Sequence, residues 1–267
     1  MEKKIFISVD MEGITGVIHW DETEEKHQDY QYFRKIMTQE ANAAVEGALE
    51  AGASHITVRD AHASARNLLP DMLDEKAVLL REWSTGPYGM MDGLDDTFDA
   101  AVCIGYHAKA GTPNGTLKHT MAGVVLDLRV NGISLPELGW NALIAGYHHV
   151  PVAFVSGDNA ICEQAKSLFG HIDTVAVKQG IGKAAVNLHP AVSRKRIREG
   201  VKKALTDLDS FSPLIYNSPY TIEIDFKDEL RTYRASWYPG VRRIGDLTVA
   251  MTCEDFFDCM RFFMFAT

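Results

Sequence analysis

The most constraining feature of this sequence is a short apolar run that ends in two closely spaced carboxylates. Residues 5–9 favour a buried β-strand, and Asp10 and Glu12 follow directly, next to two glycines. Side chains two residues apart in an extended chain point the same way, so both carboxylates should face one point beyond the strand. Like charges held so close repel each other, so a metal ion, a Lys or Arg side chain or a shared proton should lie between them. The alternative is a solvated acidic turn.

The remaining pattern of the chain predicts an α/β fold. A helical periodicity over residues 32–51 and a β-rich run at 54–58 follow the first strand, which gives a βαβ unit with a parallel sheet and a right-handed crossover. An Asn-Gly pair within residues 124–133 predicts a hairpin. Further strands are expected at 77–80, 98–105, 152–155 and 173–177, and further helices at 138–147, 159–169 and 190–208.

The pattern changes near residue 210, where two prolines are followed by a strand, a short helix, a strand and a Phe-rich helix. We therefore predict a mostly parallel sheet with flanking helices, plus a small C-terminal α+β unit. Residues 1–209 would form the metal-binding catalytic α/β domain, and residues 210–267 would form the α+β unit, which would serve packing or oligomerisation. A chain of 267 residues is long enough for this arrangement.

Composition excludes several classes of protein. A formal net charge of −9 gives no basic surplus with which to neutralise nucleic-acid phosphates. No apolar run approaches the length of a membrane span, and the first apolar run is too short for the core of an export signal. The four cysteines are scattered, as in a protein of a reducing compartment. We expect a cytoplasmic protein without nucleic-acid or membrane partners.

Three further segments place ligand-capable side chains after a strand or at a helix start. His62 follows the strand at 54–58, His107 follows the strand at 98–105, and Glu137 begins a helix behind a proline. The carboxyl ends of parallel strands meet at one sheet edge, where open α/β sheets bind ligands. Taken one at a time, each histidine could be a hydrogen-bonded surface residue, and Glu137 could simply complement the helix dipole. Together with Asp10 and Glu12, they suit two zinc-like ions with Asp10 shared by position.

Two other residues have open assignments. Asp60 could orient the imidazole of His62 or could be a turn residue. Lys178, at the end of a strand, could contact substrate or the region of Asp10, or could be a solvated cation, and we leave it out of the predicted site. The polar, aromatic segment 15–31 is long enough for a functional loop at a rim or an oligomer contact.

Several motifs in this chain resemble those of the DppA-type D-aminopeptidases. The resemblance runs from the first strand to about residue 185, and the tail resembles the family only loosely. The motifs that carry it are Ser8–Gly16, Asp60–His62, Gly105–Ala108, His119–Met121 and Glu137–Ala142, with 155–158 and 176–179 also fitting.

The resemblance implies a site, a substrate and an assembly. Two zinc ions per subunit would be held by Asp10, Glu12, His62, His107 and Glu137, with Asp10 bridging them, and His119 would be the catalytic residue. The substrates would be short peptides with D-amino-acid N-termini, and the assembly would be a ring-stacked, self-compartmentalising homodecamer that encloses its active sites. The preference for D over L residues and the choice of zinc rest on the resemblance alone.

We therefore expect a zinc-dependent D-aminopeptidase that hydrolyses short peptides or amides with metal-activated water. His119, on a glycine-containing loop, would act as acid or base or would stabilise the oxyanion. Two alternatives stay open. A dinuclear metallo-phosphoesterase would use the same metals, and a non-catalytic metal-containing dipeptide-binding protein would bind peptide without turnover.

Overall fold

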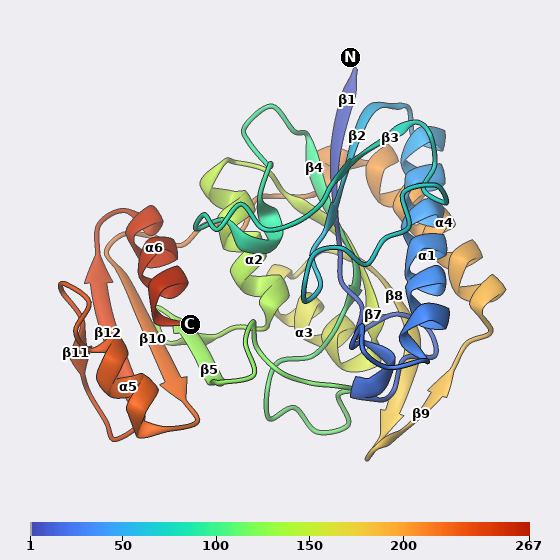
Figure 1. Ribbon diagram of the computed structural model, residues 1–267. Coiled ribbons are helices and arrows are strands. Elements are labelled where there is room, and N and C mark those ends of the chain that lie inside the picture. The colour runs from blue at the N-terminus through green and yellow to red at the C-terminus, as the bar shows by residue number, and fades with distance from the viewer. Residues whose placement is uncertain (1) are drawn as a thin grey trace.

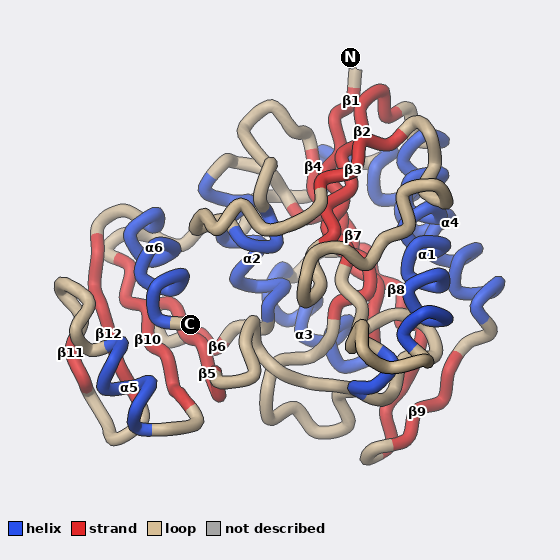
Figure 2. Tube along the Cα trace, in the orientation of Figure 1, coloured by secondary structure: helices blue, strands red, loops and turns tan. Residues whose placement is uncertain are grey.

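The computed structural model describes residues 2–267. Its central sheet has seven strands in the order β3-β2-β1-β4-β7-β8-β9 (Figures 1 and 2). All neighbouring pairs are parallel except β8 and β9. The strands are β1 (Lys3–Val9), β2 (Ala53–Asp60), β3 (Ala77–Leu80), β4 (Ala100–Tyr106), β7 (Val152–Asp158), β8 (Asp173–Ile181) and β9 (Ala184–Asn187).

Helices cover both faces of this sheet. On the right in Figure 1, α1 (Tyr30–Glu50) and α4 (Pro190–Thr206) pack on one face, and α2 (Glu137–Tyr147) and α3 (Asn159–Phe169) lie on the other. Helix α1 buries a stripe of apolar side chains spaced three and four residues apart, which include Met37, Ala41 and Ala44. Because both faces are covered, the inner strands are apolar along nearly their whole length, as β1 and β4 show.

A second, antiparallel sheet lies beside the first, on the left of Figure 1. Its strand order is β11-β12-β10-β5-β6, and helices α5 (Glu229–Ala235) and α6 (Phe256–Ala266) belong to the same part of the chain. Its strands are β5 (Val125–Val130), β6 (Ile133–Ser134), β10 (Tyr220–Phe226), β11 (Arg242–Arg243) and β12 (Thr248–Cys253). The predicted hairpin at 124–133 therefore belongs to this sheet, and the division of the chain at residue 210 stays a prediction.

The antiparallel sheet is joined to the α/β layers through aromatic packing. Trp140 of α2 is buried, and its ring lies 5.4 Å from the ring of Phe256 and 4.9 Å from that of Phe263, both in α6. Helix α2 is thus held between the central sheet and the C-terminal helix.

The predicted fold class is confirmed: a mostly parallel sheet, flanking helices and a smaller α+β part are all present. The expected helices and strands occur within a few residues of their predicted bounds. Two short strands were not predicted, β9 and β11. Both are edge strands, in which one side of the backbone lacks a partner strand and few side chains are buried, so no apolar alternation marks them.

The order of the strands creates a switch point between β1 and β4. From β1 the chain builds outward through β2 and β3, and it then returns to place β4 on the other side of β1. Loops that leave two such strands diverge, and the crevice between them is where open α/β sheets bind ligands. Asp10 follows β1 and His107 follows β4, so both lie at this crevice. Among residues 2–267, no helix combines the length and apolar character that crossing a bilayer requires.

Candidate metal centre

The six residues predicted for the site lie in one cluster at the carboxyl edge of the central sheet. Five of them are buried, each no more than 5% exposed, while the side chain of His119 is 20% exposed. Three adjacent strands supply the first four, and α2 and a loop supply the others. Asp10 and Glu12 follow β1, His62 follows β2, His107 follows β4, Glu137 is the first residue of α2, and His119 lies on the loop between β4 and β5.

The first half of the cluster contains Asp10, Glu12 and His62. The Nδ1 atom of His62 lies 3.2 Å from Oδ1 of Asp10 and 3.0 Å from Oε2 of Glu12. One nitrogen and two carboxylates therefore converge on one point, and their candidate ligand atoms all lie within 4.8 Å of one another.

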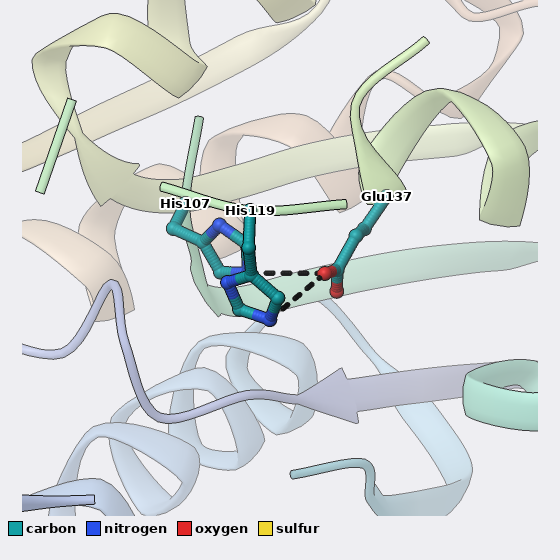
Figure 3. Close-up of side chains that lie close together, drawn as sticks. All are labelled: His107, His119 and Glu137. Carbon is teal, nitrogen blue, oxygen red and sulfur yellow. Dashed lines mark ion pairs between the residues drawn. The ribbon is translucent and has the colours of Figure 1, made fainter. Parts of the chain in front are cut away.

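The second half contains His107, His119 and Glu137 (Figure 3). The Nε2 atoms of the two histidines each lie 3.3 Å from Oε1 of Glu137. Their rings are stacked, with centroids 4.1 Å apart and planes inclined by 11°. Asp10 reaches this half too, because its Oδ2 lies 3.5 Å from Nε2 of His107. The two oxygens of Asp10 therefore face the two halves separately, and Glu12 does the same at longer range, because its Oε1 lies 4.0 Å from Nε2 of His119.

Backbone carbonyls fix the orientation of all three imidazoles. Nε2 of His62 lies 3.0 Å from the carbonyl oxygen of Thr23. Nδ1 of His107 lies 3.0 Å from the carbonyl oxygen of Ala108, and Nδ1 of His119 lies 3.0 Å from that of Leu117. A carbonyl oxygen only accepts, so the proton of each ring belongs on that nitrogen. The opposite nitrogen of each ring faces the carboxylates and can offer a lone pair, as metal-bound histidines do.

Asp60 does not orient His62, so the first reading of that residue is wrong. Its carboxylate accepts hydrogen bonds from the backbone N–H groups of Asn67 and Leu68, each at 2.6 Å, and from the Asn67 side chain at 2.8 Å. Asn67 in turn donates to the carbonyl oxygen of His62 at 2.6 Å. Asp60 therefore shapes the turn that follows β2, and Thr23 holds the imidazole.

The cluster strongly favours positive charge at its centre. Burial, with repulsion from Glu12, raises the pKa of Asp10 to about 8. Burial opposes ionisation of Glu12 and His62 as well, but their attraction for each other outweighs it. The pKa of Glu12 is therefore well below its ordinary value, and the pKa of His62 is well above its own. Burial likewise lowers the pKa of His107, but the carboxylate of Glu137 more than compensates and raises it to about 10.

These residues fit a metal site. Oδ2 of Asp10, Oε2 of Glu12 and Nε2 of His107 are buried, face the cluster and have no hydrogen-bonding partner. Unpaired buried polar atoms are costly in a folded protein, and a cation bound between them would satisfy all three. Carboxylate oxygens and imidazole nitrogens are ligands that zinc accepts, and a metal would displace the protons that the pKa shifts otherwise favour.

The loop that carries His119 is anchored at both sides of that residue. Asp158, at the end of β7, accepts hydrogen bonds from Thr116 through its backbone N–H at 2.8 Å and its hydroxyl at 3.0 Å. On the other side, the N–H of Met121 donates to Oε1 of Glu137 at 2.6 Å. The ring of Trp20 packs edge-on against His119, with centroids 5.4 Å apart.

Sequence reasoning missed Trp20, Thr23 and Asp158 as supports of the site. For Asp158 a signal was present, since an aspartate between a strand and a helix is typical of an N-cap, and Oδ1 of Asp158 does accept from the N–H of Ile161 at 2.8 Å. Thr23 acts through its carbonyl group, which every residue possesses, so no sequence pattern marks it. The expectation of a functional loop at 15–31 covers both Trp20 and Thr23.

Gly13 allows the loop after β1 to cross the end of β4. Its N–H donates to the carbonyl oxygen of Gly105 at 2.7 Å. A Cβ atom at Gly13 would lie 1.9 Å from the carbonyl oxygen of Tyr106, which is far inside contact distance. Only glycine permits this approach, which brings Asp10 next to His107.

Replacing Gly13 with alanine should therefore lower the free energy of unfolding by at least about 2 kcal/mol, because the backbone of β4 must move. Urea denaturation measures the effect. Gly123→Ala is the matched control, since a Cβ there meets nothing within 4 Å. Equal stability of the two variants would show that the crossing tolerates a side chain.

A cavity of about 510 Å³ opens over the cluster. Its walls include the indoles of Trp20 and Trp83 and the side chains of Met90 and Met121, and Glu24 and Glu25 also line it. Cavities of this size hold ligands of the dimensions of a short peptide. Asp10, Glu12, His62, His119 and Glu137 all line the cavity, so a ligand inside it would meet the cluster directly.

Comparison with known families agrees with this geometry. A family model described as D-aminopeptidase matches residues 3–265. The chain belongs to the D-aminopeptidase family. The family prediction and the expectation of an aminopeptidase are thereby confirmed.

Two similar members of the family, one a protein sequence and the other a solved structure, come from Bacillus subtilis. A D-aminopeptidase of strain 168 is 35% identical over 254 residues, which cover 94% of this chain and 92% of that protein. The solved structure of the zinc-dependent D-aminopeptidase DppA, described as a self-compartmentalizing protease, is 34% identical. It superposes with a TM-score of 0.95 and covers 98% of this chain and 96% of the other.

Proposed function

We propose that this protein is a zinc-dependent D-aminopeptidase that removes N-terminal D-amino acids from short peptides or amides. The observation that carries the proposal is the buried cluster in which three imidazoles, each held at one nitrogen by a backbone carbonyl, turn their other nitrogens toward three carboxylates, at the base of a cavity of about 510 Å³. The zinc dependence of the related Bacillus subtilis enzyme supports the choice of metal.

We assign two zinc ions to each subunit. Asp10, Glu12 and His62 would hold one ion, and Asp10, His107 and Glu137 would hold the other. Asp10 would be the shared ligand, because its two oxygens face His62 and His107, the histidines assigned to the two ions. When bound, such ions lower the pKa of a water molecule and polarise a carbonyl oxygen.

His119 is the proposed catalytic residue. The Leu117 carbonyl oxygen holds its Nδ1, so its Nε2 faces the cluster and is free to take a proton and pass it to the departing amine. Stacking on His107 and contact with Trp20 fix the plane of the ring. The carboxylates of Glu24 and Glu25 at the cavity would attract the free ammonium group of the substrate, which favours cleavage next to the N-terminus.

A panel of D- and L-aminoacyl amides, assayed together with metal content, tests this function. We expect about two zinc ions per chain, hydrolysis of the D-aminoacyl amides and loss of hydrolysis after treatment with a chelator. Cleavage of a generic phosphodiester with no action on D-alanyl peptides would instead identify a phosphoesterase. Dipeptide binding without turnover, with less than one zinc per chain, would identify a binding protein.

We further propose that the protein assembles as a homodecamer in the cytoplasm. The related Bacillus subtilis enzyme is self-compartmentalizing. Leu230, Tyr233 and Trp237 form an apolar surface on and after α5, and they are 77%, 53% and 72% exposed, respectively. Such a surface suits burial against a second copy of the chain. The cysteines of residues 2–267 are free thiols, which fits a reducing compartment.

Replacing Trp237 with glutamate should shift the assembly to smaller species, because a charge would have to be buried at the contact. Light scattering coupled to size-exclusion chromatography measures the mass. Ile181→Glu, at an equally exposed apolar residue at the end of β8, is the control and should leave the mass unchanged. An unaltered mass for Trp237→Glu would exclude the α5 surface from the assembly.

A further inference from the structure

Lys178 is a buried cation enclosed by the loop that carries Glu12. It lies in β8, opposite Asp158 of β7, and is only 2% exposed. Its Nζ atom donates hydrogen bonds to the carbonyl oxygens of Glu12, Ile14 (3.1 Å) and Val17. A lysine ammonium has three protons and no acceptor, so these three carbonyls use its full donor capacity. The interpretation of Lys178 as a solvated cation is therefore wrong.

The loop arranges its backbone groups around this ammonium. While the three carbonyls turn inward to Lys178, two N–H groups of the same segment donate to neighbouring elements. Gly13 donates to Gly105 of β4 at 2.7 Å, and Thr15 donates to the Glu40 carboxylate of α1 at 3.2 Å. Lys178 is thus the group on which the carbonyls of Glu12, Ile14 and Val17 converge, and the first of these residues belongs to the cluster itself.

An apolar side chain in place of Lys178 would leave the loop without its central donor. The carbonyl oxygens of Glu12 and Val17 would lose their donor, and that of Ile14 would keep only the N–H of Val17 at 3.2 Å, so the loop would have to rearrange to reach water or other donors. The carboxylates of Asp158, Glu40 and Glu12 attract the ammonium and oppose the burial that lowers the pKa of Lys178 to about 8.

We propose that Lys178 is a positioning residue for the metal-binding loop. By binding the carbonyls of Glu12, Ile14 and Val17, it holds the carboxylates of Asp10 and Glu12 in place before a metal binds, so that little ordering remains to be done on binding. The inference rests on the proposed function, because it requires that this loop bind zinc. Lys178, which lies outside the cluster, would then contribute part of the affinity for the metal.

The test compares Lys178→Met with Lys3→Met. Met keeps the length of the side chain and removes the ammonium group. Lys3 offers a matched control, because its Nζ also donates to two backbone carbonyls, Ala51 (3.1 Å) and Leu205 (2.7 Å), where β1 begins, at the edge of the sheet opposite the site. The zinc dissociation constant is measured by competition with a chromophoric chelator, and the stability of the metal-free protein is measured with urea.

We expect Lys178→Met to weaken zinc binding about tenfold or more, the effect typical of losing a group that supports a metal ligand. Lys3→Met should lose stability without any change in zinc affinity. The visible absorption spectrum of the cobalt-substituted protein should change in Lys178→Met and not in Lys3→Met, which a general loss of stability would not produce. If Lys178→Met does not fold, Lys178→Gln, which keeps a donor, provides the same comparison.

Two results would overturn the inference, and they are distinguishable. Zinc affinity and a cobalt spectrum equal to those of the wild type in Lys178→Met or Lys178→Gln would show that the loop is held without the ammonium, and the proposed function would stand. Failure of the wild-type protein to bind zinc would overturn the proposed function and the inference with it.

Discussion

Replacing Asp10 with asparagine is expected to remove both metal and activity. One oxygen of Asp10 lies 3.2 Å from His62 and the other lies 3.5 Å from His107, and we therefore assign Asp10 to both proposed zinc ions. An amide is neutral and offers only one oxygen, so it cannot bridge two cations with negative charge. We expect zinc content to fall from about two per chain to one or none, and peptidase activity to fall to background. Metal analysis after gel filtration, with an aminoacyl amide assay, measures both.

Asp92→Asn is the matched control for this change. Asp92 is also a buried aspartate, 6% exposed, but its carboxylate faces the guanidinium of Arg59 at 3.7 Å instead of the cluster. This variant should keep its zinc even where it loses stability. Full zinc retention in Asp10→Asn would contradict the assignment of Asp10 as the shared ligand.

Replacing His119 with alanine is expected to leave the zinc content intact and to lower kcat by about 10²–10⁴-fold, the range typical of a lost acid–base group. Among the six residues of the cluster, His119 is the most exposed and lies farthest along the chain from any strand or helix, and we propose that the other five hold the metal without it. Steady-state kinetics on a D-aminoacyl amide, with metal analysis of the same preparation, separate the loss of a catalytic group from the loss of a ligand.

His19→Ala controls for changes in the loops near the cavity. His19 precedes Trp20, but its imidazole accepts from the N–H of Asp21 at 3.2 Å and lies near that carboxylate, away from the cluster. Its removal should change kcat by less than about threefold, within the small effects typical of surface substitutions. Loss of one zinc ion in His119→Ala would mean that His119 is a ligand, and undiminished activity would mean that it has no catalytic role.

The parts of this molecule that could be predicted from sequence are those that depend on side-chain type and spacing. Apolar runs such as 5–9 and 98–105 located β1 and β4, and a parallel sheet places the residues after such strands at one edge. The sequence therefore predicts that Asp10, His62 and His107 lie together, as they do in the structure. Their roles as metal ligands remain predictions.

The parts that could not be predicted depend on backbone groups and on burial. The carbonyl oxygens that orient His62 and receive Lys178 belong to segments whose side chains reveal nothing about them. A lysine at the end of a strand is in most proteins solvated, and only the path of the loop over β8 shows that Lys178 is enclosed. Similarly, no local pattern tells that the hairpin at 125–134 pairs with a strand that begins some ninety residues later.

The pairing of β5 with β10 affects when this enzyme can mature during synthesis. Helix α2, which carries Glu137, follows directly on the hairpin β5–β6, and Trp140 in that helix packs against Phe256 and Phe263 near the end of the chain. A nascent chain that lacks these last residues has neither the strand partner of β5 nor the aromatic support of α2. The helix that carries Glu137 therefore gains its final support only after Phe256 and Phe263 have been synthesised, and a nascent chain that stops before them lacks the completed cluster.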